Sequence, residues 1–333
     1  MEREEERTAV HPYSGCYADR NTIMASAAAD PYTERPPEAT LCLVVHAVGG
    51  GASVRSIRRL RGGVSSAVHA IDVADAAGRL HRLVLRRFVN ADWLAREPDL
   101  AEHEARVLAL LKDSNVPAPE LVAVDAAAEV CDAQAVLMTR LPGRVELAPR
   151  DMESWLTRLA SVLPAIHAVE APTSVRPYGA YNNVRELAPP AWSENRDAWA
   201  KALDFASGAG PSEATVFIHR DYHPANVLWQ HGNVSGVVDW EDASRGPAGI
   251  DIGHCRRNLV CLHGVDVADR FLTAYETLAG SRHHPYWDAV TAMDCLPDPG
   301  VYRGWTDHGV RGLTEETVRA RLDEYIVSIV RRC

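Results

Sequence analysis

The stretch FIHRDYHPANVLW, residues 217–229, is followed after a short turn by VSGVVDWEDASRGPAGID, residues 234–251. NVLW and VSGVVDW flank the turn sequence QHGN, so the sequence predicts an antiparallel hairpin here. Pairing Trp229 near Val234 places Asn226 and Asp239 at the same open end of that hairpin. An amide oxygen and a carboxylate that converge there suit Mg²⁺, which accepts few protein oxygens and completes its shell with water and substrate phosphates.

Asp221 lies five residues before Asn226, in a loop closed by Pro224. From that position its carboxylate can accept a proton from an attacking hydroxyl while a metal ion draws charge from a phosphoryl group. His219 is expected to hold the loop. The pattern therefore indicates phosphoryl transfer.

The segments before residue 144 predict a small lobe rich in strands. Short β-branched stretches are separated by glycine-containing turns, as in SIRRLRGGVSSAVHAIDV (56–73), GRLHRLVLRRF (78–88) and AQAVLMTRLPG (133–143). Between the last two lies DLAEHEARVLALLKDSNVPAPE (99–120), which is predicted to be a helix that stops before Pro117.

Glu104 shares the apolar face of this predicted helix with Leu100, Val107, Leu108 and Leu111. A carboxylate turned inward needs a cation, because burying it alone costs several kcal/mol. The candidate is Arg86, at the end of the apolar strand, because neither of the two lysines of the chain, Lys112 and Lys201, follows a glycine-rich turn on a strand.

From about residue 144 the sequence predicts a helical lobe. ESWLTRLASVLPAIHAV (153–169), VADRFLTAYETLAG (267–280) and EETVRARLDEYIVSIVRRC (315–333) carry apolar residues at helical spacing. Pro164 is expected to kink or break the first of these helices. The expected organisation is a disordered tail over residues 1–40, a small lobe of sheet and one long helix over 41–143, and a large helical lobe over 144–333.

Composition and charge exclude several classes of protein. With 333 residues, 47% of them hydrophobic and 24% charged, the chain is an ordinary globular protein. A net charge of −10 argues against nucleic acid as a partner. No apolar run reaches the roughly 18 residues of a membrane helix, the start MEREEER is unlike a secretion signal, and the scattered cysteines indicate reduced thiols. We expect a cytoplasmic protein with no membrane or nucleic-acid partner and an oligomeric state left open.

These motifs resemble the protein-kinase-like fold, and specifically the aminoglycoside phosphotransferase and choline kinase branch of small-molecule kinases. HRDYHPANVLW fits the catalytic-loop pattern H-R-D-x-x-x-x-N, and VVDWEDASRGPAGID resembles the metal-binding segment of that branch. The resemblance implies a bilobal α+β fold, in which the lobe over 41–143 binds the nucleotide and the lobe over 144–333 holds the catalytic loop and an acceptor pocket. It implies ATP and Mg²⁺ as cofactors, Asp221 as base, and Asn226 and Asp239 as metal ligands. It also implies that Asp251 caps a helix or braces the loop.

The resemblance extends upstream to about residue 55. It places Gly62, Gly63, Ser65 and Ser66 over the nucleotide phosphates and pairs Arg86 with Glu104. Adenine would meet a hinge that contains Met138, Thr139 and Leu141.

Some features depart from the family pattern or have a simpler interpretation. The strand cation is an arginine where protein kinases have lysine, and Arg87 is an alternative because the register is open by one residue. GGVSS lacks the full G-x-G-x-x-G and could be a plain hairpin turn, and Glu104 could be a solvated helix carboxylate. Only about ten residues separate Asp239 from GID, which leaves no room for an activation loop ending in A-P-E. Small molecules are therefore favoured over proteins as acceptors.

The acceptor itself stays open at this stage. Carboxylates and aromatic rings after residue 239 would suit a cationic, hydroxylated acceptor. These candidates are Asp242, Asp288, Asp294, Asp298, Asp307, Glu315, Glu316, Trp240, Tyr286, Trp287 and Trp305. One hypothesis is a kinase for an aminoglycoside, macrolide or related antibiotic, another is a metabolic kinase for choline, homoserine or a sugar, and a third is a nucleotide-binding pseudokinase-like module. The choice between ATP and GTP and the hydroxyl attacked are also open.

Overall fold

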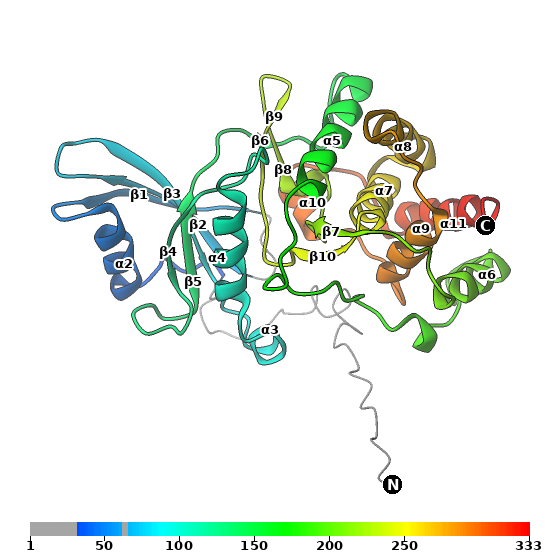
Figure 1. Ribbon diagram of the computed structural model, residues 1–333, viewed down its shortest axis with the longest axis horizontal. Helices are drawn as coiled ribbons and strands as arrows, with labels where there is room; N and C mark the ends of the chain where they lie inside the picture. Colours follow the sequence, from blue (N-terminus) through cyan, green and yellow to red (C-terminus); the bar gives the residue numbers. More distant parts are fainter. Residues whose placement is uncertain (1–31, 62–65) are drawn as a thin grey trace, which may run out of the picture.

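The first lobe is built on a five-stranded antiparallel sheet with the strand order β1-β2-β3-β5-β4 (Figure 1). The computed structural model describes residues 32–61 and 66–333. The strands are β1 (Ser53–Arg59), β2 (Ala67–Ala74), β3 (Leu80–Arg87), β4 (Leu121–Asp125) and β5 (Ala135–Thr139). The helices of this lobe are α2 (Glu38–Val48), α3 (Ala91–Arg96) and α4 (Leu100–Leu111).

A helix covers each face of this sheet, because strand residues alternate between the two faces. Leu83 and Leu85 of β3 and Leu137 of β5 pack with α2, whereas Val136 and Met138 belong to the core that contains α4. The α4 core continues into the second lobe, so α4 lies between the sheet and the helices beyond it (Figure 1).

The predicted helix over 99–120 is confirmed as α4, which ends at Leu111, before Pro117. Helix α2 was not expected from the sequence. It begins at Glu38, so the last residues of the expected tail are helical, and residues 1–31 lie outside the described residues.

The second lobe is mainly helical, as predicted. Its main helices are α5 (Met152–His167), α6 (Arg196–Ser207), α7 (Gly249–His263), α8 (Val265–Ala279), α9 (Pro285–Ala292), α10 (Arg303–Asp307) and α11 (Glu315–Val330). Short 3₁₀ turns are η1 (Val184–Glu186), η2 (Pro224–Asn226) and η3 (Met293–Cys295). Small antiparallel sheets combine β6 (Arg144–Val145) with β8 (Val227–Gln230) and β9 (Asn233–Val237), and β7 (Thr215–Ile218) with β10 (Ser244–Pro247).

Helices α5, α8 and α11 confirm the three helices predicted from spacing. Of the two outcomes expected at Pro164, a kink or a break in the first of these helices, the break is wrong. Helix α5 runs through Pro164 and ends at His167. The ring removes one backbone donor close to the end of the helix, where the packed face of Leu159, Leu163 and Ile166 holds the last turn in place.

The hairpin predicted around QHGN is confirmed. Strands β8 and β9 pair antiparallel with Trp229 opposite Val234. The backbone N–H of Val238 donates to the carbonyl oxygen of Asn226 at 2.9 Å. Asn226 and the segment leading into Asp239 therefore lie side by side at the open end.

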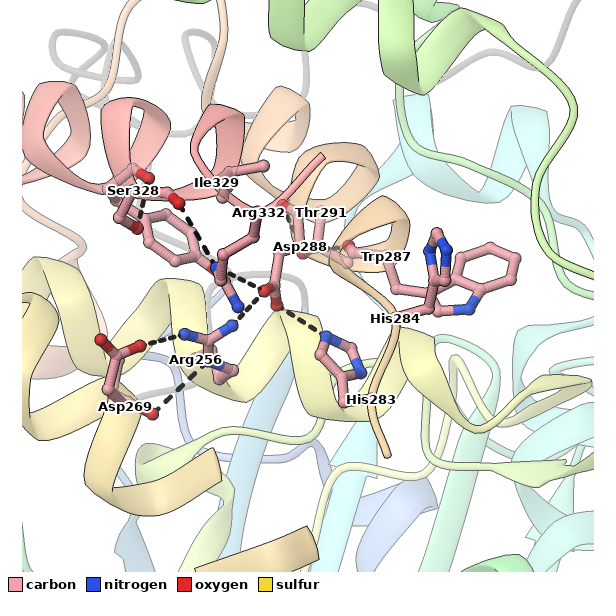
Figure 2. Close-up of polar contacts among 12 residues, drawn as sticks. Arg256, Asp269, His283, His284, Trp287, Asp288, Thr291, Ser328, Ile329 and Arg332 are labelled. Carbon is pink, nitrogen blue, oxygen red and sulfur yellow. Dashed lines mark hydrogen bonds and ion pairs between the residues drawn. The ribbon is translucent and has the colours of Figure 1, made fainter. Parts of the chain in front are cut away.

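A buried ion-pair network joins the C-terminal helices (Figure 2). Asp288 of α9 is fully buried and accepts from Arg256 of α7, from Arg332 at 2.9 Å and from His283 at 2.8 Å, and Arg256 also pairs with Asp269 of α8. Asp288 therefore belongs to the core. The expectation that it lines an acceptor pocket is wrong, because its carboxylate is needed to compensate buried cations.

Within residues 32–61 and 66–333, none of the helices combines the length and the apolar composition that crossing a bilayer requires. The cysteines of the same residues are free thiols.

Candidate active site

The loop between β7 and β8 carries the predicted catalytic residues, and α7 holds its backbone in place. The Asp251 carboxylate accepts hydrogen bonds from the backbone N–H groups of His219 at 2.9 Å and Arg220 at 2.7 Å. Arg220 has a left-handed backbone conformation with a φ of 73°, which costs a non-glycine residue free energy that its surroundings must offset. Two roles were expected for Asp251, capping a helix or bracing the loop. In the structure Asp251 braces the loop.

His219 links this loop to the strand end that carries the second carboxylate. Its ring is buried, and Nε2 donates to the carbonyl oxygen of Val238 at 3.0 Å. The ring centroid lies 4.4 Å from that of Trp240. Because Val238 directly precedes Asp239, this position suits a residue that holds the loop, and the role stays a prediction.

The Asp221 carboxylate is surrounded by donors. Oδ2 accepts from Asn226 Nδ2 at 3.1 Å and lies 3.5 Å from His223 Nε2, while Oδ1 lies 2.9 Å from His254 Nε2. Burial alone would raise the pKa of Asp221, but His223 and His254 hold this pKa well below the ordinary carboxyl value. The group is therefore ionised at neutral pH, as an acceptor of a hydroxyl proton must be.

Asn226 and Asp239 present oxygen atoms at the open end of the hairpin. The Asn226 side-chain NH₂ donates to the Asp221 carbonyl oxygen at 3.0 Å as well as to its carboxylate, which leaves Oδ1 as the atom available to a cation. Asp239 follows β9 in a left-handed conformation with a φ of 74°. One amide oxygen and one carboxylate fit Mg²⁺ bound together with substrate phosphates. Among the described residues, no group of three or more His, Cys, Asp or Glu side chains forms a complete metal cage.

Arg86 is the centre of a buried cluster that crosses between the lobes. Its Nε lies 3.4 Å from Glu104, NH2 lies 2.6 Å from Asp239, and NH1 contacts Glu241. Burial alone would lower the pKa of Arg86, but Asp239, Glu104 and Glu241 raise it well above its ordinary value. Burial raises the pKa of Glu104 to about 7. The sequence-predicted partners are in contact, and Glu104 is not a solvated carboxylate.

Arg87, the alternative in the sequence, turns to the opposite face of the sheet. Its guanidinium pairs with Asp132 and donates to the carbonyl oxygen of Glu34 at 3.2 Å. The alternation of β3 thus places Arg86, and not Arg87, beside Asp239.

On the nucleotide side, Gly62, Gly63 and Ser65 lie outside the described residues. Ser66 is buried, and its hydroxyl has no hydrogen-bond partner among the described residues. A buried hydroxyl without a partner is costly, and the expected role of Ser66 over the phosphates stays a prediction.

The hinge residues connect β5 to the second lobe. The Met138 side chain is buried in the α4 core. The Thr139 N–H donates to the Glu120 carbonyl oxygen, and the Thr139 hydroxyl accepts from the Glu120 N–H, both at 2.9 Å. Leu141 packs against β9 so closely that a Cβ on Gly236 would lie 2.4 Å from it. The Arg140 N–H donates to the Arg82 carbonyl oxygen at 2.9 Å, so a backbone donor for adenine would have to come from residues after Arg140.

Some of the residues proposed to bind the acceptor lie in the core, and others lie at the surface. Trp240 is fully buried, so the expectation that its ring lines an acceptor pocket is wrong. Trp305 is nearly fully buried and lines a small cavity with Cys295 and Tyr302. Asp298 forms an ion pair with Arg319 at 2.6 Å. Burial and then the charge of Asp221 raise the pKa of Asp242 to about 6, and the Tyr181 hydroxyl donates to the Asp242 carboxylate at 2.8 Å.

The sequence analysis missed Glu241 and His254. Glu241 comes two residues after Asp239, and His254 lies one helical turn after Asp251, on the same face of α7. That spacing was a usable signal, because a helix whose Asp251 meets the loop must point His254 at the same loop.

A two-lobed fold whose catalytic loop and strand-borne cation meet at the lobe interface is that of a phosphotransferase of the kinase-like class. The sequence model of the phosphotransferase enzyme family matches residues 56–290, and the chain belongs to this family. Members of this family transfer phosphoryl groups to hydroxyl groups of small molecules.

Comparison with individual proteins agrees with this assignment. N-acetylmuramate/N-acetylglucosamine kinase of Pseudomonas aeruginosa is 26% identical over 133 residues, which are 40% of this chain and 36% of that kinase. The fold is similar to that of aminoglycoside phosphotransferase APH(4)-Ia in its complex with ADP and hygromycin B (TM-score 0.56, 18% identity, 89% of this chain and 98% of that one). It is also similar to macrolide 2'-phosphotransferase MphH of Brachybacterium faecium (TM-score 0.53, 19% identity, 89% and 99% covered).

Proposed function

We propose that this chain transfers the γ-phosphoryl group of ATP to a hydroxyl group of an aminoglycoside-type or related antibiotic. The observation that carries the proposal is the convergence of Asp221, Asn226 and Asp239 at one end of the β8–β9 hairpin, opposite Arg86 of the first lobe.

Asp221 is the base in this proposal. Its ionised carboxylate would accept a hydrogen bond from the acceptor hydroxyl and take the proton as the bond to phosphorus forms. The low pKa of Asp221 makes it a weak base. We therefore expect the proton to move late, and the main contribution of Asp221 to be orientation of the hydroxyl.

Asn226 Oδ1 and the Asp239 carboxylate would hold Mg²⁺, which when bound neutralises charge on the phosphates. In this structure Asp239 forms an ion pair with Arg86 at 2.6 Å. This ion pair would have to break before the Asp239 carboxylate could bind Mg²⁺. Arg86 would keep its contacts with Glu104 and Glu241 and turn one guanidinium nitrogen toward the nucleotide phosphates.

The acceptor is proposed to be an antibiotic because the similar structures include an enzyme with bound hygromycin B and a macrolide phosphotransferase. The Asp242 carboxylate beside Asp221 would suit an amino group on such an acceptor. A second candidate, a kinase for an N-acetylated sugar, is favoured by the similarity to the N-acetylmuramate/N-acetylglucosamine kinase.

The test is ADP release from Mg-ATP with hygromycin B, a macrolide, N-acetylmuramate, N-acetylglucosamine and choline as separate acceptors. Turnover above the water background with an antibiotic, and phosphorylated product by mass spectrometry, would support the first candidate. Turnover with the N-acetylated sugars alone would support the second. Absence of Mg-ATP binding would contradict both.

A further inference from the structure

His254 of α7 contacts the proposed base from outside the catalytic loop. Its ring is fully buried, and Nε2 lies 2.9 Å from Asp221 Oδ1. The other carboxylate oxygen, Oδ2, accepts from Asn226 Nδ2 at 3.1 Å. Asp221 is thus held at one oxygen by its own loop and at the other by a neighbouring helix.

The surroundings of His254 determine which ring nitrogen carries the proton. Burial and the nearby Arg257 lower the pKa of His254 to about 3, so the ring is neutral at physiological pH. An ionised carboxylate can only accept, so the proton must be on Nε2, facing Asp221. Arg257 NH2 lies 3.1 Å from Nδ1 and 3.0 Å from Nε2. A nitrogen at nearly the same distance from both ring nitrogens lies over the face of the ring, where its positive charge disfavours a protonated imidazole.

Arg257 is itself held in a buried position. Its NH1 donates to Cys295 Sγ at 3.3 Å. His254 therefore has a carboxylate acceptor at Nε2 and a cation over its ring, which suits the neutral Nε2–H tautomer.

Helix α7 contacts both the backbone and a side chain of the catalytic loop. Asp251, one turn earlier, holds the loop backbone through the His219 and Arg220 N–H groups. His254 meets the side chain of Asp221. The same helix therefore determines both where the loop lies and how its carboxylate is turned.

We propose that His254 is a positioning residue, whose Nε2–H orients the Asp221 carboxylate toward the acceptor hydroxyl. The inference rests on the proposed function of Asp221 as base. His254 touches neither nucleotide nor acceptor in this account and acts through Asp221 alone.

The kinetic test compares His254→Leu with His254→Gln. Leucine removes the donor, and a carboxylate free to rotate should lower kcat by about 10²-fold, with the dissociation constant of Mg-ATP unchanged because the nucleotide contacts lie elsewhere. Glutamine offers an N–H donor and an oxygen acceptor at similar reach, and it should recover most of the lost kcat. His263→Leu is the matched control on the same helix, since its ring packs against Trp155, away from the loop.

The rate is measured as ADP release with the fastest acceptor of the panel, water included. If Asp221→Ala turns over as fast as the wild type, the proposed base is wrong. If Asp221→Ala is slow but His254→Leu is as fast as the wild type, the present inference alone is overturned. It is also overturned if the glutamine variant is as slow as the leucine variant.

A second readout needs no turnover and no variant. Nitrogen-15 NMR spectra of the histidine-labelled wild-type protein should show His254 as the neutral Nε2–H tautomer down to about pH 5. An Nδ1–H tautomer or a protonated ring at neutral pH would overturn the proposal whatever the kinetics.

Discussion

At the scale of single residues, Arg86 is where the site differs from the protein-kinase pattern, which has a lysine on this strand. One guanidinium contacts Glu104, Asp239 and Glu241 through different nitrogens. An ammonium group is a point charge on a flexible stem and cannot meet all of them with this geometry. The arginine on this strand is therefore matched to its cluster of carboxylates and is not a simple replacement for lysine.

We predict that Arg86→Lys lowers both stability and nucleotide affinity. Glu104 and Glu241 would be left with weaker compensation in a buried site, at a cost of roughly 1–3 kcal/mol. Thermal unfolding and calorimetric titration with Mg-ATP measure the two effects. Arg87→Lys, on the opposite face, should leave the Mg-ATP affinity unchanged; an equal loss in both variants would contradict the assignment of Arg86.

Asp239 supports a second prediction at this scale. Asp239→Ala should remove the Mg²⁺ dependence of ATP binding, since the carboxylate proposed to hold the ion is gone. Titrations with ATP in the presence and absence of Mg²⁺ measure this difference. Asp298→Ala is the matched control, because that carboxylate forms its ion pair with Arg319 of α11 and is not a proposed metal ligand. A Mg²⁺ effect as large in Asp239→Ala as in the wild type would refute the role.

The residues that could be predicted from the sequence are those close together along the chain. Asp221, Asn226 and Asp239 lie on one loop and one hairpin, so their spacing alone brings them together. Glu241 and His254 were missed because their roles depend on contacts with β3 and with the catalytic loop. Such contacts depend on how elements pack. The spacing of Asp251 and His254 indicates the contact of His254 only when Asp251 is already placed against the loop.

At the scale of elements, the network around Asp288 holds α7, α8, α9 and the end of α11 together (Figure 2). Burial alone would raise the pKa of Asp288, but Arg256, His283 and Arg332 hold this pKa far below the ordinary carboxyl value. The carboxylate therefore stays ionised in the folded protein at a pH where the unfolded chain binds a proton.

We predict that Asp288→Asn destabilises the protein by roughly 3 kcal/mol at neutral pH. The contribution of Asp288 is fully present above the unfolded carboxyl pKa of about 4 and is lost as the pH falls further. Denaturant unfolding of wild type and variant from pH 7 to pH 3 measures the difference. A difference that stays constant or grows toward acid pH would contradict the ion-pair interpretation.

The elements also show where sequence patterns are strong. The long amphipathic helices α4, α5, α8 and α11 could be predicted because each repeats its apolar residues over several turns. Helix α2 could not, since CLVVHAV is an apolar run with β-branched residues that favours a strand as much as a helix. Its helical form follows from packing Leu41 and Val44 on the sheet.

At the scale of the whole molecule, the two lobes share the α4 core and are also joined by specific polar contacts. Arg86 reaches Asp239 and Glu241, the Val237 N–H donates to the Pro117 carbonyl oxygen at 2.8 Å, and Arg176 pairs with Glu97 at 2.6 Å. A ligand that contacts both lobes would add to these contacts and stabilise the folded chain by mass action.

We predict that Mg-ATP raises the midpoint of thermal unfolding. At a concentration of about 100 times the dissociation constant, the gain should be about 2.7 kcal/mol. Differential scanning calorimetry over a range of Mg-ATP concentrations measures it. No shift at saturating Mg-ATP would mean that the nucleotide does not bind the folded protein.

The central claim is that Asp221 accepts the proton of an acceptor hydroxyl during phosphoryl transfer. Its most direct test is the rate of transfer of labelled γ-phosphoryl from Mg-ATP to the acceptor, in wild type and in Asp221→Asn, with nucleotide affinity measured in parallel. We predict that the variant binds Mg-ATP as the wild type does and transfers the label at least about 10²-fold more slowly. Equal transfer rates in the two proteins would contradict the account.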